Sequence, residues 1–139
     1  MKKILIGLVI VLVACAIWFA FYSAPPVVAP TVDKSDLIVV DTPKPNEIVK
    51  SPLLVEGRAR GVWYFEASFP IKFYDGAGKE IAIGIAQAQS DWMTKDFVPF
   101  KAQLEFKKPT TDTGTLVLQK DNPSGLPEHD DELRIPIRF

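Results

Sequence analysis

The chain has 139 residues, enough for one globular domain of roughly a hundred residues once an apolar N-terminal segment is set aside. Its 16 basic and 17 acidic residues give a formal net charge of −1. That balance argues against a nucleic-acid-binding protein, which needs a strongly basic face. The only cysteine, Cys15, excludes a domain stabilised by an internal disulfide.

Residues 1–22 form a predicted membrane segment. Lys2 and Lys3 precede an uncharged, almost wholly apolar run at 4–22, which as a helix is long enough to cross a hydrocarbon core of about 30 Å. The next basic residue is Lys34, so the bias of basic residues toward the inner side places the N-terminus in the cytoplasm. The sequence therefore predicts a single-pass protein of the bacterial cytoplasmic membrane with an extracytoplasmic domain.

A second form of membrane attachment stays open at Cys15. The sequence Leu-Val-Ala-Cys at 12–15 resembles a bacterial lipobox, so a lipoprotein anchored at Cys15 is the alternative to an uncleaved helix. The helix is favoured because apolar and aromatic residues continue after Cys15, where a processed lipoprotein would enter a polar tether. Residues 23–36 contain three prolines and no periodic apolar face, and are predicted to be a semi-extended tether.

Residues 37–139 show short alternating segments separated by turn signals. Seven of them are predicted to be strands: 37–41, 53–60, 66–75, 80–89, 97–106, 115–120 and 133–139. Asp-Gly-Ala-Gly-Lys at 75–79 supplies glycines for a hairpin turn between the third and fourth. We expect an all-β fold, an immunoglobulin-like antiparallel β-sandwich of about seven strands.

The alternation also assigns side chains to faces. In segment 53–60, Leu53 and Val55 share one face and Leu54 lies on the other. We expect an aspartate at either Leu54 or Val55 to unfold so small a sandwich, because a charge cannot be buried unpaired. In segment 80–89, the three isoleucines share one face and small residues lie between them.

Five separated motifs carry a resemblance to a known family. They are Pro-x-Pro at 43–45, Ser-Pro-Leu-x-Val-x-Gly-x-Ala at 51–59, Trp-x-Phe-Glu-x-x-Phe-Pro at 63–70, Trp-Met-Thr-x-Asp-Phe-x-Pro-Phe at 92–100 and Asp-Asn-Pro-Ser-Gly at 121–125. Over about residues 37–139 the chain resembles the bacterial immunoglobulin-like domain first described in spore germination proteins. The resemblance implies an extracytoplasmic β-sandwich with an interaction role at the cell envelope, no enzymatic activity and no cofactor.

Two connections contain most of the candidate binding residues, which are large and apolar: Trp63, Tyr64, Phe65, Trp92, Met93 and Phe97. If both connections lie at one end of the sandwich, these side chains form a surface suited to protein or sugar. The alternative is that most of the six cap the core and two are exposed.

Two partners fit such a surface. The favoured hypothesis is an interaction module that docks another cell-envelope protein, through these loops or through a sheet edge. The alternative is a wall module that binds the glycan or peptide of peptidoglycan. Under both hypotheses, Trp92→Ala is expected to lower binding and leave the domain folded.

Catalysis and metal binding have weaker support. Ser124 lies near His129 in the sequence but lacks the Gly-x-Ser-x-Gly turn of a nucleophile, so we predict no catalytic residues and a solvated His129. The acidic loop at 128–132 matches no calcium-loop spacing, and whether it holds a cation is left open. We expect Asp121, Asn122 and Ser124 to fix the turn before the last strand by hydrogen bonding.

Overall fold

The computed structural model describes residues 33–139. The expected membrane segment at 1–22 and the tether up to residue 32 lie outside the described residues. Within 33–139, no helix combines the length and hydropathy that a bilayer crossing requires.

The described chain forms seven strands and two short 3-10 turns. The strands are β1 (Ile38–Thr42), β2 (Leu53–Arg60), β3 (Ser68–Asp75), β4 (Glu80–Ala88), β5 (Phe97–Leu104), β6 (Thr113–Gln119) and β7 (Glu132–Arg138), and the turns are η1 (Gly61–Trp63) and η2 (Pro127–His129). Each strand overlaps one of the seven predicted segments. The expected all-β fold is confirmed, and its boundaries shift by at most two residues.

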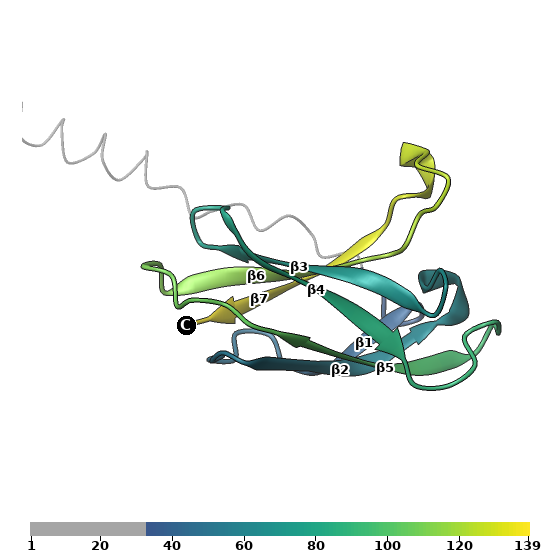
Figure 1. The fold of residues 1–139 in the computed structure, drawn as a ribbon, viewed down its shortest axis with the longest axis horizontal. Coiled ribbons are helices and arrows are strands. Elements are labelled where there is room, and N and C mark those ends of the chain that lie inside the picture. The colour runs from purple at the N-terminus through teal and green to yellow at the C-terminus, as the bar shows by residue number, and fades with distance from the viewer. Residues whose placement is uncertain (1–32) are drawn as a thin grey trace, which may run out of the picture. The chain divides into compact units, whose positions relative to one another are not determined.

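The strands are arranged in the order β1-β2-β5-β4-β3-β6-β7, and all neighbours are antiparallel. β1, β2 and β5 form one layer, and β4, β3, β6 and β7 form the other (Figure 1). The layers meet where β4 pairs with β5, and that pairing is limited to Gln87 with Lys101 and Ala88 with Phe100. Away from this junction the two strands diverge (Figure 1).

On the other side of the sandwich, the segment between β1 and β2 closes the fold. Its backbone reaches β7, because the Val49 amide donates to the Arg138 carbonyl at 2.9 Å and the Arg138 amide donates to the Glu47 carbonyl at 2.9 Å. Val49 is buried there. Pro43 and Pro45 thus lie where the chain passes from one layer to the other. A proline, which has no backbone N–H to donate, is tolerated there because the segment is not a central strand.

The core between the layers is dominated by aromatic side chains. Phe69 packs edge-on against Phe100 of the opposite layer, with ring centroids 5.0 Å apart. At the other end, Phe73 meets Phe106 edge-on at 4.9 Å and Phe139 at 5.4 Å. Among the described residues no polar or charged residue is fully buried, so the core is held by apolar burial and ring packing.

β2 shows the expected alternation and corrects one expectation drawn from it. Leu53 and Val55 are buried, whereas Leu54 is 47% exposed on the outer surface of its layer. An aspartate at position 54 would keep its hydration, so Leu54→Asp is not expected to unfold the domain.

β4 turns its small residues, and not its isoleucines, toward the core. Each small residue pairs in register with a large buried residue of β3: Phe73 with Ala82, Ile71 with Gly84 and Phe69 with Ala86. Ile83 and Ile85 therefore point to solvent. A register shift near the start of the strand leaves Ile81 partly buried against the core.

Candidate functional site

The connections after β2 and after β4 meet at one end of the sandwich, the condition on which the candidate surface depended. Gly61 begins η1, and its amide donates to the Asp96 carbonyl at 3.3 Å. A Cβ at this position would lie 1.9 Å from the Thr94 carbonyl oxygen and 2.4 Å from that of Trp92. Only glycine permits so close an approach of the two backbones.

Two of the six candidate residues belong to the core. Trp63 is fully buried and Tyr64 is nearly so. The Tyr64 hydroxyl donates to the Val98 carbonyl at 2.7 Å, and its ring packs edge-on against Phe69 at 5.2 Å. Burial raises the pKa of the Tyr64 hydroxyl to about 12, because the phenolate would be poorly solvated there. These two rings offer little surface to a partner.

Phe97 and Trp92 are half-buried. The Arg60 guanidinium lies over the Phe97 ring at 4.3 Å from its centroid, a cation–π contact. The same Arg60 donates to the Asp36 carbonyl at 2.9 Å and to the Lys95 carbonyl at 3.1 Å. Trp92 packs against the core cluster. Both rings therefore stabilise the end of the sandwich as well as bordering its surface.

The exposed part of this end is formed by three apolar side chains. Met93 is 76% exposed, Val62 is 57% exposed and Phe65 is 41% exposed. We call Val62, Phe65 and Met93, with the bordering Trp92, the loop-end surface. Two of the six predicted residues, Phe65 and Met93, are thus exposed, which is the number expected if most of the six cap the core. Val62 was missed because a single valine after Gly61 carries no distinguishing signal in the sequence.

The connection between β6 and β7 projects from the same region (Figure 1). Its backbone is tied to the core where the Asp121 amide donates to the Trp63 carbonyl at 3.0 Å. The Asn122 side-chain amide donates to the Leu126 carbonyl at 2.9 Å and to the Asp130 carboxylate at 2.7 Å. The expectation that side-chain hydrogen bonds fix this turn is confirmed for Asn122 and Ser124.

Ser124 and His129 do not form a nucleophile and base. The Ser124 hydroxyl donates to the Asn122 side-chain oxygen at 2.6 Å. His129 is exposed, and its carbonyl accepts a hydrogen bond from the Lys120 ammonium at 3.1 Å. General-base catalysis requires the base within hydrogen-bond reach of the proton it removes, and this arrangement points the serine hydroxyl elsewhere.

Two acidic residues of this connection, Asp130 and Asp131, are bound to protein donors. Asp130 accepts from Asn122, and Asp131 forms an ion pair with Lys34. Within residues 33–139, no three histidine, cysteine, aspartate or glutamate side chains are grouped as metal ligands.

Comparison with protein families decides the relationship of the chain. A family model described as the immunoglobulin-like domain of bacterial spore germination matches residues 37–126. The chain belongs to this family. The match to the immunoglobulin-like domain of bacterial spore germination runs from the start of β1 into the connection after β6, so it includes the whole loop-end surface. The family is typically non-catalytic. Comparison with curated proteins and with solved structures gave no match.

Proposed function

We propose that this protein is a non-enzymatic interaction module that docks another protein of the bacterial cell envelope. The N-terminal apolar segment would hold it at the cytoplasmic membrane with the sandwich on the outer side. Membership of the family supports an interaction role. The observation that carries the proposal is the loop-end surface, where three large apolar side chains are exposed on adjoining segments.

The loop-end surface is presented by backbone that is already ordered. Around Met93, the Met93 amide donates to the Asp91 carboxylate at 3.0 Å and the Thr94 amide to the Trp92 carbonyl at 2.8 Å. On the facing segment, the Phe65 and Ser68 backbones exchange two hydrogen bonds at 3.0 and 3.1 Å. A preorganised loop loses little conformational entropy on binding, so the exposed apolar groups can contribute to affinity.

The alternative is a module that binds peptidoglycan glycan, and the geometry favours it less. Sugar recognition uses exposed aromatic faces, yet Trp63 is buried and Trp92 is half-buried. Phe65, at 41%, is the most exposed aromatic ring among the six candidates. Apolar anchors such as Met93 and Val62 suit a protein surface better than a hydroxyl-rich glycan.

Site-specific crosslinking in cells tests the proposal. The full-length protein would carry a photoreactive residue in place of Met93. A matched control would carry it in place of Leu54, which is exposed on the outer surface of the layer formed by β1, β2 and β5. We expect one envelope protein to be captured reproducibly from position 93 and not from position 54. We further expect Met93→Glu to reduce binding of that protein to full-length chain at least about tenfold, the loss of one hot-spot anchor.

The contrary outcomes are specific. Equal capture from both positions, or Met93→Glu with unchanged binding, would remove the loop-end surface as the docking site. Cosedimentation of the full-length protein with purified sacculi, abolished by Phe65→Ala, would support the peptidoglycan alternative instead.

A further inference from the structure

Acidic residues lie next to the exposed side chains of the loop-end surface. The Asp91 carboxylate accepts a hydrogen bond from the Met93 amide at 3.0 Å, so a negative charge is fixed beside the most exposed of these residues. Glu66 directly follows Phe65 and is itself exposed. Within residues 33–139, neither Asp91 nor Glu66 belongs to an ion pair. Both charges are therefore free to interact with a partner.

A third acidic residue, Asp96, contacts the segment that carries Val62. Its carbonyl accepts the amide of Gly61, the residue before Val62, at 3.3 Å. Asp96 is exposed, and no ion pair of the described residues includes it. Every exposed apolar residue of the loop-end surface thus has an acidic residue on the same segment or on the adjoining one.

Basic side chains beside this surface are fewer. Arg60 ends β2, and its guanidinium lies over the Phe97 ring while it donates to the carbonyls of Asp36 and Lys95. Lys95 is exposed. The immediate surroundings of the loop-end surface therefore hold three carboxylates and two cations, and one of these cations, Arg60, is already engaged by the domain itself.

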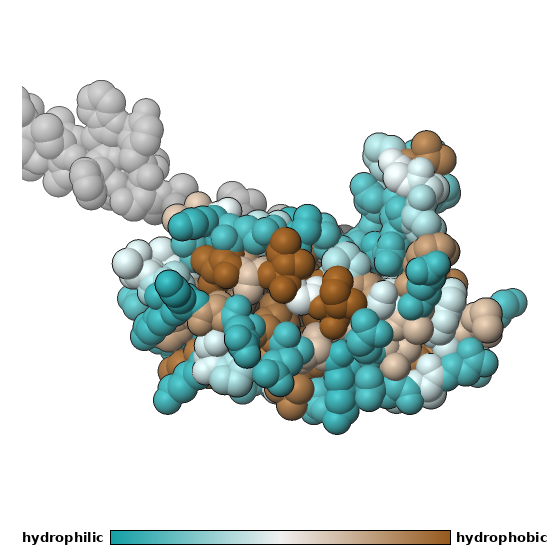
Figure 2. Space-filling model, viewed as in Figure 1, coloured by the Kyte–Doolittle hydropathy of each residue, from teal (hydrophilic) through white to brown (hydrophobic). Residues whose placement is uncertain are grey.

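The whole loop end of the sandwich is acidic. Its segments outside the strands are 33–37, 61–67, 89–96 and 120–131. They contain nine acidic and three basic residues, whereas the rest of the described chain contains eight acidic and eleven basic residues. The segment 120–131 contributes four of the acidic residues, and Figure 2 shows that its projecting surface is mostly hydrophilic. Negative charge is thus concentrated at the end of the domain that carries the exposed apolar side chains.

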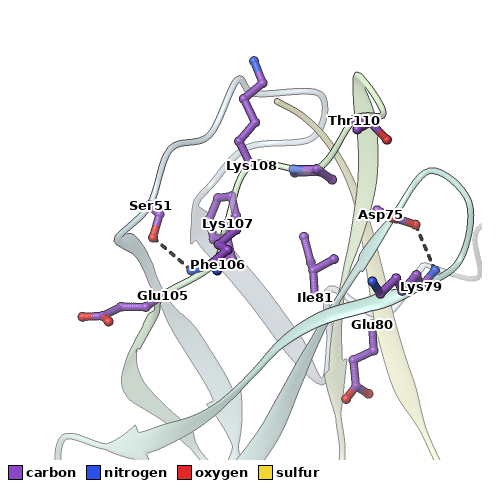
Figure 3. Close-up of a pocket in the computed structure, with 11 residues that line it drawn as sticks. Ser51, Asp75, Lys79, Glu80, Ile81, Glu105, Phe106, Lys107, Lys108 and Thr110 are labelled. Carbon is purple, nitrogen blue, oxygen red and sulfur yellow. Dashed lines mark hydrogen bonds between the residues drawn. The ribbon is translucent and has the colours of Figure 1, made fainter.

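The opposite end of the sandwich differs in charge. Its connections, 43–52, 76–79 and 105–112, contain three acidic and five basic residues. A cleft of about 860 Å³ lies there between the β3–β4 hairpin and the connection that follows β5 (Figure 3). Three lysines and three acidic residues line the cleft: Lys79, Lys107, Lys108, Asp75, Glu80 and Glu105. Their charges balance, so the cleft does not select a partner by charge as the loop end does.

We propose that the loop-end surface receives a segment of the partner protein in which large apolar side chains are flanked by lysine or arginine. The inference rests on the docking role proposed above and specifies the chemistry of the partner. The apolar side chains of that segment would pack on Val62, Phe65 and Met93, and its basic residues would lie against the surrounding carboxylates. An apolar centre with a charged rim is the usual composition of a protein interface.

The sign of the charge distinguishes this occupant from others. An acidic end attracts and orients a basic partner as it approaches, and it repels an anionic bilayer. An uncharged glycan would gain little from the carboxylates. A basic protein segment can both cover the apolar side chains and complement the charge around them.

Peptide selection on the full-length protein tests this assignment. The protein is held in nanodiscs of zwitterionic phospholipid, and a displayed library of random peptides is first depleted on empty nanodiscs. Peptides of about twelve residues, at roughly 3.3 Å per residue when extended, are long enough to cross the loop end. We expect the retained peptides to be enriched in lysine or arginine beside large apolar residues. Met93→Ser removes an apolar anchor without changing the charge, and should weaken their binding at least about tenfold.

A matched pair of triple variants tests the role of charge. The first combines Glu66→Gln, Asp91→Asn and Asp96→Asn, of which Asp91→Asn keeps a side-chain oxygen for the Met93 amide. We expect it to bind the selected peptides about tenfold more weakly than the wild type at about 0.1 M salt. At about 1 M salt the two proteins should bind equally, because the Debye length falls to about 3 Å.

The control variant removes three equally exposed carboxylates from the opposite end and changes the net charge by the same amount. It combines Glu80→Gln, Glu105→Gln and Asp112→Asn. We expect its affinity for the selected peptides to equal that of the wild type, because charges so far from the loop end are screened by salt.

Several results would overturn the assignment. These are enrichment of acidic or uncharged peptides, no enrichment over the unselected library, or equal losses of affinity in the two triple variants. Binding to anionic phospholipid vesicles that is lost in Met93→Ser would overturn it in favour of a membrane surface. Self-association that is lost in the first triple variant would overturn it in favour of a second copy of the chain.

Failure of this inference is distinguishable from failure of the docking role. Peptide binding that is lost in Met93→Ser but unchanged in the first triple variant would keep the loop-end surface as a docking site and overturn its preference for a basic partner. Peptide binding that Met93→Ser leaves unchanged would overturn both, because the peptides would then bind elsewhere on the protein.

Discussion

Trp63 and Tyr64 lie two and three residues after Gly61, and both rings enter the core at the point where that glycine lets two connections touch. The Trp63 indole N–H is buried and has no hydrogen-bond partner within the described residues. Leaving such a donor unpaired costs about 1–3 kcal/mol. The large apolar area of the ring offsets that cost, so Trp63 acts here as a core residue and not as a sugar platform.

Val55 and its neighbour Leu54 provide a sharp test of side-chain placement. Val55 is fully buried, so Val55→Asp places an unpaired carboxyl in the core and should cost several kcal/mol, comparable to the total stability of about 5–15 kcal/mol. Leu54→Asp should change the free energy of unfolding by about 1 kcal/mol or less, as surface substitutions do. Urea unfolding followed by circular dichroism measures both. A Val55→Asp variant with unchanged stability would mean that β2 is displaced by one residue.

Tyr64 should make stability depend on alkaline pH. The pKa of its hydroxyl is raised to about 12 in the folded protein, above the ordinary value of 10.0. The folded state therefore holds this proton more tightly, and the resulting stability is fully present below pH 10 and is lost as pH rises from 10 to 12. We expect the free energy of unfolding of the wild type to fall more steeply over this interval than that of Tyr64→Phe. Parallel curves for the two proteins would contradict the assigned burial.

At the scale of an element, β4 reverses the usual relation between hydrophobicity and burial. Ile83 and Ile85 face solvent and the small residues face the core, because the neighbouring positions of β3 are filled by Phe69, Ile71 and Phe73. Cores are close-packed, so a second row of large side chains would not fit between the layers. The consequence is a pair of exposed isoleucines on the outer face of the layer.

This arrangement predicts opposite outcomes at neighbouring positions. Ala86→Ile should destabilise the domain by about 1–3 kcal/mol, because added methyl groups would overpack the space beside Phe69. Ile85→Ala, which removes a larger apolar group, should cost about 0.5 kcal/mol or less from its exposed position. Thermal unfolding of the two variants compares them directly. Should Ile85→Ala prove the more damaging change, the inward face of β4 would be misassigned.

At the scale of the whole molecule, β4 connects the two ends of the sandwich. The strand begins at the β3–β4 hairpin beside the cleft and ends at the connection that carries Met93 (Figure 1).

Much of this organisation follows from local patterns. Alternation at period two located all seven strands, and Asp-Gly-Ala-Gly-Lys at 75–79 identified the hairpin turn, because both signals depend on residues close in the chain. The loops of the candidate surface were likewise found from their large apolar residues. The sequence did not show which of those residues are exposed. Trp63 and Met93 are both large apolar residues in predicted connections, so no local pattern distinguishes the buried one from the exposed one.

The sequence by itself thus determined the fold class, the strand positions, the hairpin and the family, all of which rest on short-range patterns. Only the tertiary structure decided which face of each strand is buried and which strand edge is left unpaired. Which side chains are buried depends on the residues of the neighbouring strand, as Ala86 of β4 is paired with Phe69 of β3. Which backbone groups are paired depends on where β4 and β5 diverge. These are contacts between residues distant in the chain, and no local pattern specifies them.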